Sequence, residues 1–154
     1  MHSFVAYRKA VNSITTHYLA LPEAAQGEQA AQELATLPDG RTIVVLFDGY
    51  TLPANQPADI AASIEQLGSP LSPELREQVM AASPAVRLTY DRAQALIRSK
   101  YSVDDEAYFA RIGVGVALGA YTFEPGEQEE LLAFGSFVES ARAWGRAERV
   151  KLGL

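Results

Sequence analysis

Three arginines and two aromatic residues near the carboxyl end are the side chains best suited to binding chemistry. Arg142, Arg146 and Arg149 follow a +4, +3 spacing, which places them in one row along a helix. Phe137 and Trp144 share the neighbouring arc of the same helix, which is predominantly apolar. Tryptophan and arginine are among the commonest anchors of protein interfaces. The spacing therefore predicts a partner-binding surface formed by Phe137, Arg142, Trp144, Arg146 and Arg149.

The same residues also fit a purely structural role, and the sequence leaves both roles open. Arg142 can pair with Glu139 one helical turn earlier, and a row of charges on a helix is often only a solvated face. A tryptophan such as Trp144 is more often a core residue than an interface anchor, although large aromatic side chains occur in both places. The packing of this helix decides between the two roles.

Motifs for catalysis, for a cofactor and for a metal are absent. The glycine-rich segment 113–119 has one residue too many for the dinucleotide-binding spacing and lacks the Lys-Ser/Thr of a phosphate loop. Gly135-Ser136-Phe137 does not match a nucleophile elbow. Asp104-Asp105-Glu106 lacks the alternating ligands of a calcium loop and suits the start of a helix. We therefore expect no catalytic residue, no cofactor and no metal site.

A small-molecule or enzymatic pocket is one rival to the docking surface. His17, Tyr18, Asp48 and Tyr50 could converge between a sheet and the helices. The other histidine, His2, lies near the amino terminus, where we expect the chain to be mobile. A concave apolar pocket containing the four side chains would support this alternative.

Composition argues against several classes of partner. The 154 residues carry a net charge of −6, which disfavours binding to nucleic acid or to an anionic membrane. Without cysteine there is no disulfide, thiolate nucleophile or Cys-type zinc site. Polar residues between positions 12 and 17 interrupt any signal-peptide core, and no apolar run approaches the roughly 20 residues of a membrane helix. We expect a cytoplasmic protein with no membrane partner.

The first fifty residues have the pattern of a small β-sheet. Residues 4–7 and 13–21 are rich in aromatic and β-branched side chains. Residues 34–37 and 42–47 flank Pro38-Asp39-Gly40-Arg41, where proline and glycine favour a reversal of the chain, so they predict a hairpin. The second strand of this hairpin is apolar on both faces, which predicts that it is covered on both sides.

Helix signals dominate the chain from residue 58 onward, after a linker rich in proline at 50–57. Ser72-Pro73 and Ser83-Pro84 are typical helix starts, and Ser102 with Asp105 resembles a capping box. Together with apolar periodicity these signals predict helices over residues 59–67, 73–82, 84–100, 103–120 and 125–154.

Residues 111–121 are compatible with two structures. Apolar residues alternate there with Gly113, Gly115 and Gly119, as in a strand with a glycine face. In a helix each interior glycine costs about 1 kcal/mol relative to alanine. The cap at Ser102 and the helical neighbours favour the helix.

These elements predict an α+β fold, because a run of strands is followed by a run of helices. We expect a small antiparallel β-meander followed by four to five helices. The length fits one domain over residues 1–154, with a β-rich part at 1–50 and a helical part at 58–154.

The last third of the chain resembles small phage and prophage accessory proteins, including tail-assembly factors. The resemblance lies in the acidic helix start Tyr101-Ser102-Val103-Asp104-Asp105-Glu106 and in the pattern Phe137-Val138-Glu139, Arg142-Ala143-Trp144. It implies a non-enzymatic virion or assembly role with protein partners, and it carries no catalytic residue.

The sequence therefore favours a non-enzymatic interaction or assembly protein that docks through its carboxyl-terminal amphipathic helix. Its partner is another protein or a second copy of the chain. One alternative is a nucleic-acid contact through the arginine row, which the net negative charge makes unfavourable. The pocket between sheet and helices is the other alternative.

Overall fold

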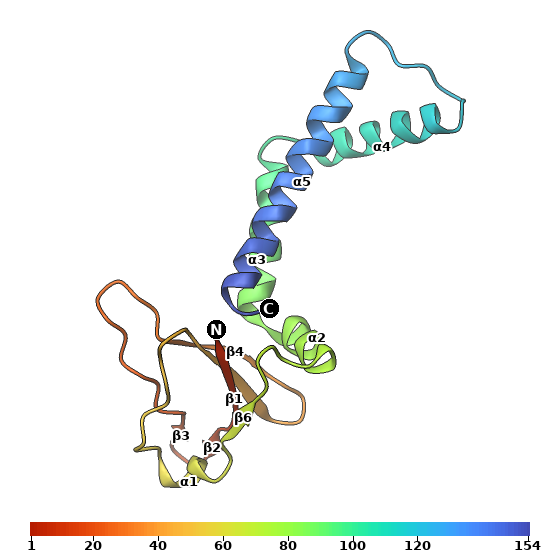
Figure 1. The fold of residues 1–154 in the computed structure, drawn as a ribbon. Coiled ribbons are helices and arrows are strands. Elements are labelled where there is room, and N and C mark those ends of the chain that lie inside the picture. The colour runs from red at the N-terminus through yellow and green to blue at the C-terminus, as the bar shows by residue number, and fades with distance from the viewer. The chain divides into compact units, whose positions relative to one another are not determined.

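The computed structural model describes all 154 residues and confirms the α+β class (Figure 1). The strands are β1 Ser3–Arg8, β2 Ala10–Val11, β3 Thr16–His17, β4 Ala31–Thr36, β5 Arg41–Leu46 and β6 Glu65–Leu67. The helices are α1 Ala58–Ala61, α2 Pro73–Ala82, α3 Pro84–Arg98, α4 Val103–Ala117 and α5 Glu127–Lys151.

The main sheet has the order β4-β5-β1-β6, and every neighbouring pair is antiparallel. The predicted hairpin is formed by β4 and β5, and it turns at Gly40, whose φ of +85° glycine adopts readily. Its turn is reinforced by Asp39, whose carboxylate accepts hydrogen bonds from the backbone and side chain of Arg41.

Both faces of the sheet are covered, as the apolar pattern of β5 predicts. Side chains of β1, β4 and β5 that point to one face pack with Val79 of α2, Val86 and the carboxyl-terminal Leu154. Side chains on the other face of β1 and β5 pack with Leu19 and with Ile60 of α1. The sheet therefore lies in the centre of a two-sided hydrophobic core.

Two sequence predictions of elements are wrong. The segment 13–21 forms only the short β3, which pairs with β2 outside the main sheet. The expected helix at 59–67 stops at Ala61, and residues 65–67 become β6, which pairs with β1. The backbone of β1 needs hydrogen-bond partners at its open edge, and pairing with β6 supplies them where a helix would not.

The helix starts agree with the capping signals. Ser72 accepts a hydrogen bond from the backbone of Leu75 at the start of α2. Ser102 and Asp105 form a full capping box at the start of α4. The segment 111–121, which is compatible with a strand or a helix in the sequence, belongs to this helix as far as Ala117. Gly119 then ends this helix with a φ of +69°.

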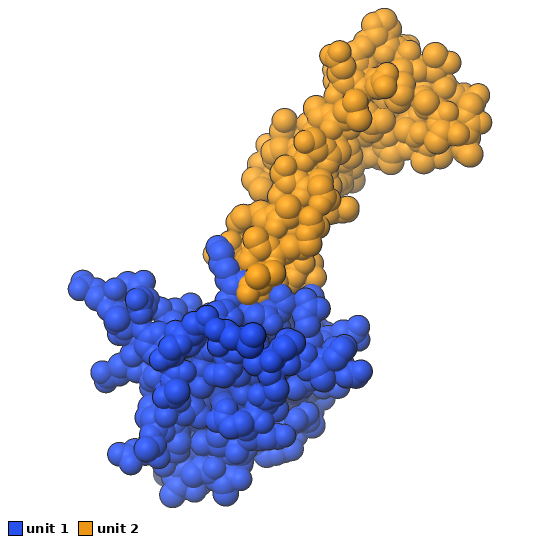
Figure 2. Space-filling model, in the orientation of Figure 1, with its two compact units in different colours: residues 1–87, 151–154 blue, residues 88–150 orange.

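The chain divides into two compact units (Figure 2). The first, here called the sheet unit, contains residues 1–87 and 151–154; the second, the helical unit, contains residues 88–150. The division falls inside α3 rather than at the linker 50–57, because β6 and α2 pack with the sheet. Among the helices, none combines the length and the apolar character that a membrane span requires.

Candidate docking surface of the helical unit

Within the helical unit, α3 and α5 meet along a line of small side chains, here called the α3–α5 seam. Ala141 is 1% exposed, and Gly145 is buried one turn further on. A Cβ built on Gly145 would lie 3.8 Å from both Thr89 and Ala93. Because these side chains are small, the two helices approach closely, and larger residues on either side of the seam are left at the surface.

One side of the seam carries the three predicted arginines. Arg142, Arg146 and Arg149 line a hollow of about 340 Å³, here called the arginine hollow. Its remaining walls are formed by Tyr90, Ala93, Gln94, Ile97, Glu106, Val138 and Gly145. The +4, +3 spacing thus brings the arginines to one place, as the sequence predicts, with apolar side chains between them.

The arginines of this hollow differ in their partners. Arg146 forms an ion pair with Glu139, and the hydrogen bond from Arg146 lowers the pKa of that carboxyl. The guanidinium of Arg149 lies over the ring of Tyr90, 4.9 Å from its centroid. Arg142 forms no ion pair, and it acts on Glu139 only through its charge at longer range. The hollow therefore holds one cation that is free to meet an added anion.

Trp144 lies on the opposite side of the seam. It is 37% exposed and lines a separate hollow of about 320 Å³ with Arg92 and Leu96. The structure therefore does not bring Trp144 and the three arginines into one surface. At 100° per residue Trp144 lies about 160° around the helix from Arg142, and the buried Ala141 and Gly145 occupy the arc between them.

Phe137 belongs to a third group of side chains. Its ring lies 5.7 Å from that of Tyr101, which also contacts Phe134 at 5.1 Å. Phe109 stacks on Phe134 at 4.9 Å. This aromatic cluster joins the start of α4 to the middle of α5, so Phe137 contributes to packing and does not line the arginine hollow.

A second contact between α4 and α5 involves a carboxylate that the sequence analysis missed. Glu127 is 8% exposed and accepts hydrogen bonds from the hydroxyls of Tyr108 and Tyr121 and from the backbone of Glu124. The bond from Tyr108 lowers the pKa of Glu127, and the same bond raises the pKa of Tyr108 to about 12. Tyr108 and Tyr121 precede Glu127 by 19 and 6 residues, a spacing that has no local sequence signature.

The four residues of the predicted pocket do not converge. His17 pairs with Asp59, and Lys9 lies over the ring of Tyr18. Asp48 and Tyr50 line a different, open hollow together with His2 and Glu28. The pocket hypothesis is wrong for this set of residues, because His17 and Tyr18 do not line the hollow that contains Asp48 and Tyr50.

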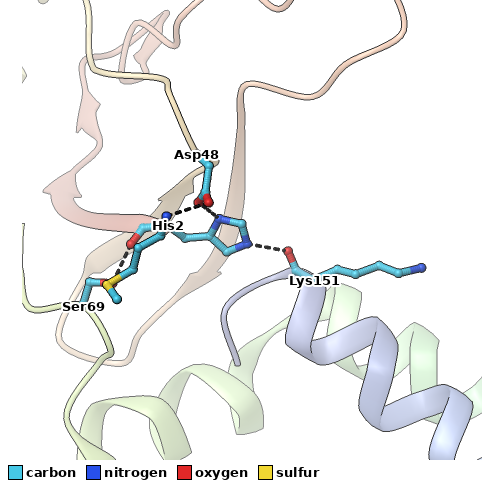
Figure 3. A network of polar contacts seen from close by, with 5 residues as sticks. His2, Asp48, Ser69 and Lys151 are labelled. Atoms are coloured by element: carbon cyan, nitrogen blue, oxygen red, sulfur yellow. Dashed lines mark hydrogen bonds and ion pairs between the residues drawn. The ribbon is translucent and has the colours of Figure 1, made fainter.

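His2, which the sequence analysis expected to be mobile, is held by a polar network (Figure 3). With a proton on each ring nitrogen, it donates from Nδ1 to Asp48 at 2.6 Å and from Nε2 to the carbonyl oxygen of Lys151 at 3.1 Å. The terminal ammonium of Met1 also binds Asp48 at 2.6 Å, and it is the main cause of the lowered pKa of this carboxyl. The network ties the two ends of the sheet unit together.

The structure contains no group of three or more His, Asp or Glu side chains that could hold a metal ion. Comparison with known protein families, with curated proteins and with solved structures finds no match to the chain.

Proposed function

We propose that this chain is a non-enzymatic interaction protein, and that the arginine hollow of its helical unit docks an acidic segment of a partner protein. The observation that carries the proposal is the convergence of three arginines on one hollow in which Arg142 has no ion-pair partner. A carboxylate entering the hollow would satisfy this guanidinium and could be bound in the bidentate manner that arginine favours.

The surface of the helical unit supports an association role. Of its large hydrophobic side chains, ten are exposed, while only four of its hydrophobic residues are buried. The exposed residues are Leu88, Tyr90, Leu96, Val103, Val114, Leu118, Tyr121, Leu132, Trp144 and Val150. Exposed apolar side chains beside arginines are typical of surfaces that bind other proteins.

The carboxylates in and around the hollow favour a protein over a nucleic acid. Glu106 lines the hollow and pairs with Arg98 at 2.5 Å, and Glu139 neutralises Arg146. A nucleic-acid backbone, with a charge on every phosphate, would be repelled by these groups. A single aspartate or glutamate side chain carries one negative charge and is repelled less than a row of phosphates.

A peptide-binding measurement tests the proposal. The probes are a fluorescent amphipathic peptide of glutamate and leucine, its lysine-leucine counterpart, and a short DNA duplex, each followed by fluorescence anisotropy at low and moderate salt. We expect binding of the acidic peptide alone, and loss of at least tenfold in affinity for Arg142→Glu. Binding of DNA with a steep salt dependence would replace the proposal by the nucleic-acid alternative.

Trp144→Ala is the matched control, because Trp144 lies outside the arginine hollow. We expect this variant to bind the acidic peptide as the parent does. Loss of binding in Trp144→Ala with retention in Arg142→Glu would show that the tryptophan hollow is the docking site and would overturn the proposal.

An assembly accessory role of the kind implied by the resemblance to phage proteins belongs to the same proposal. Such a role needs a protein that joins other proteins without chemistry, and the exposed helical unit suits it. A cytoplasmic location is part of the proposal as well, in keeping with a chain that contains no cysteine.

A further inference from the structure

A second surface lies on the outward face of α5, and we propose that it pairs with the same face of a second copy of the chain, with the two helices antiparallel. This inference goes beyond the docking of an acidic segment, since its partner is a second copy of the chain, and the two surfaces share Arg146.

Exposed aliphatic side chains lie near both ends of the outward face of α5. Leu132 is 65% exposed and Val150 is 66% exposed, although both are large aliphatic residues. They are separated by 18 residues, or five turns, so they lie on the same side of the helix. Between them Ala143 is exposed, and Gly135 has open space around it. These small residues allow another helix to approach closely, and the exposed pair Glu139 and Arg146 lies on the same face.

The charges along α5 select the antiparallel direction. Its first turn contains the exposed Glu129 and Glu130, and its last third contains Arg142, Arg146 and Arg149. In a parallel pair, acidic ends would lie beside acidic ends and basic ends beside basic ends. In an antiparallel pair each acidic end lies beside a basic end, which gives complementary charge at both ends of the contact.

One register satisfies the apolar and the charged residues together. If Leu132 of one copy lies opposite Val150 of the other, Glu139 comes within three residues of the second copy's Arg146, about 4.5 Å along the axis. Glu139 and Arg146 already pair within each chain. Two such pairs would meet across the two-fold axis and form a four-residue network, which is the self-complementary arrangement that a symmetric dimer requires.

The size of the contact sets its strength. A helix of 25 residues is about 37 Å long and roughly 10 Å wide, so its footprint is roughly 400 Å² per copy. A standard stable interface uses about 800 Å² per partner. We therefore expect a weak dimer that forms and dissociates with concentration.

Disulfide trapping tests the direction of pairing directly, because the natural chain contains no cysteine. The variants Leu132→Cys and Val150→Cys are mixed and oxidised, and the covalent dimers are counted. A disulfide needs Cα atoms about 4.4–6.8 Å apart. We expect a mixed Leu132→Cys/Val150→Cys dimer, and no dimer from Leu132→Cys alone, since its two copies would lie about 27 Å apart.

Val114→Cys serves as a matched control, because Val114 is a similarly exposed aliphatic residue on α4. Its mixture with Leu132→Cys should give no dimer above background. Preferential trapping of Leu132→Cys with itself would indicate parallel pairing and would overturn the inference, as would equal trapping in the control.

Light scattering behind size exclusion, over a wide range of concentrations, gives an independent readout on the uncrosslinked chain. We expect a dimer at high concentration that Ala143→Glu abolishes and that Ala107→Glu, on exposed α4, retains. A monomer at every concentration would overturn the inference. The acidic-peptide assay on the same proteins separates the two ideas, since peptide binding by a strict monomer would preserve the proposed function.

Discussion

Most of the buried hydrophobic side chains of the chain lie in the sheet unit, whereas the helical unit exposes more large hydrophobic side chains than it buries. Eighteen of the twenty-two buried hydrophobic residues lie in the sheet unit, which exposes five large hydrophobic side chains. The helical unit buries four and exposes ten. The two hydrophobic core clusters lie on the two faces of the sheet, and neither includes a residue of the helical unit.

This difference indicates where stability and binding reside. A unit with a two-sided core is stabilised by burial within the chain itself. A helical unit with few buried residues is stabilised by individual contacts such as the capping box of α4, the aromatic cluster and the bonds to Glu127. Its remaining apolar surface is available to a partner, which is consistent with the proposed docking role.

The largest effect should come from the core of the sheet. Ile43→Ala removes a side chain with no exposed surface from β5, and we expect a loss of about 2–5 kcal/mol in the free energy of unfolding. Val114→Ala, at an exposed position of α4, should change it by less than about 0.5 kcal/mol. Urea titration followed by circular dichroism measures both. Equal losses would contradict the contrast between the two units.

Two glycines of the helical unit should respond in opposite directions. A Cβ on Gly115 would lie 2.8 Å from the Cβ of Tyr121, so Gly115→Ala should cost about 1–3 kcal/mol. Gly135 has open space around it, so Gly135→Ala should stabilise α5 by about 0.5–1 kcal/mol. Thermal unfolding of the two variants at low concentration checks the signs. Two changes of the same sign would show that the close contact between Gly115 and Tyr121 does not affect stability.

The carboxylate of Glu127 should make the helical unit sensitive to acid. Its pKa in the folded protein lies below the ordinary value of 4.5, mainly because Tyr108 donates a hydrogen bond to it. Its contribution to stability is therefore present above that ordinary value and is lost as the pH falls through the lower folded value. Glu127→Gln should lower the unfolding temperature at pH 7 and remove much of this pH dependence. Glu129→Gln, at an exposed position in the same turn, should change neither.

The smallest effect is expected from the polar network of the sheet unit. Asp48 has a lowered pKa, chiefly through the terminal ammonium and then through His2, and its side chain is largely exposed. Exposed ion pairs contribute little, so Asp48→Asn should reduce the urea midpoint only slightly at pH 7. The ion pair requires an ionised carboxylate. The difference between Asp48→Asn and the parent should therefore vanish at acidic pH, once the carboxyl of Asp48 is protonated. A difference that persists at pH 2 would contradict the ion-pair explanation.

Much of the fold follows from local sequence signals. The Pro38-Asp39-Gly40 turn, the Ser72 and Ser102 caps and the apolar run of β5 each depend on residues close together in the chain, and each is found as predicted. The segment 59–67 shows the limit of such signals. Its apolar residues have helical spacing. Residues 65–67 nevertheless form a strand, because they pair with the open edge of β1, about sixty residues earlier in the chain.

The candidate site could be predicted only in part. The row of three arginines follows from helical spacing, and they do share one hollow. The separation of Trp144 from that row follows from helical spacing as well, whereas the packing of α3 against the arc between them does not. Glu127 and His2 were missed for a similar reason, since their partners Tyr108 and Asp48 are distant in sequence.

The sequence by itself determined where the helices start, where the hairpin turns and which charges gather on α5, because capping, turn conformation and helical spacing act over a few residues. Only the tertiary structure decided that β6 completes the sheet and that Ala141 and Gly145, between Arg142 and Trp144, form the α3–α5 seam. These outcomes depend on which surfaces meet, and meeting surfaces are set by packing between residues far apart in the chain.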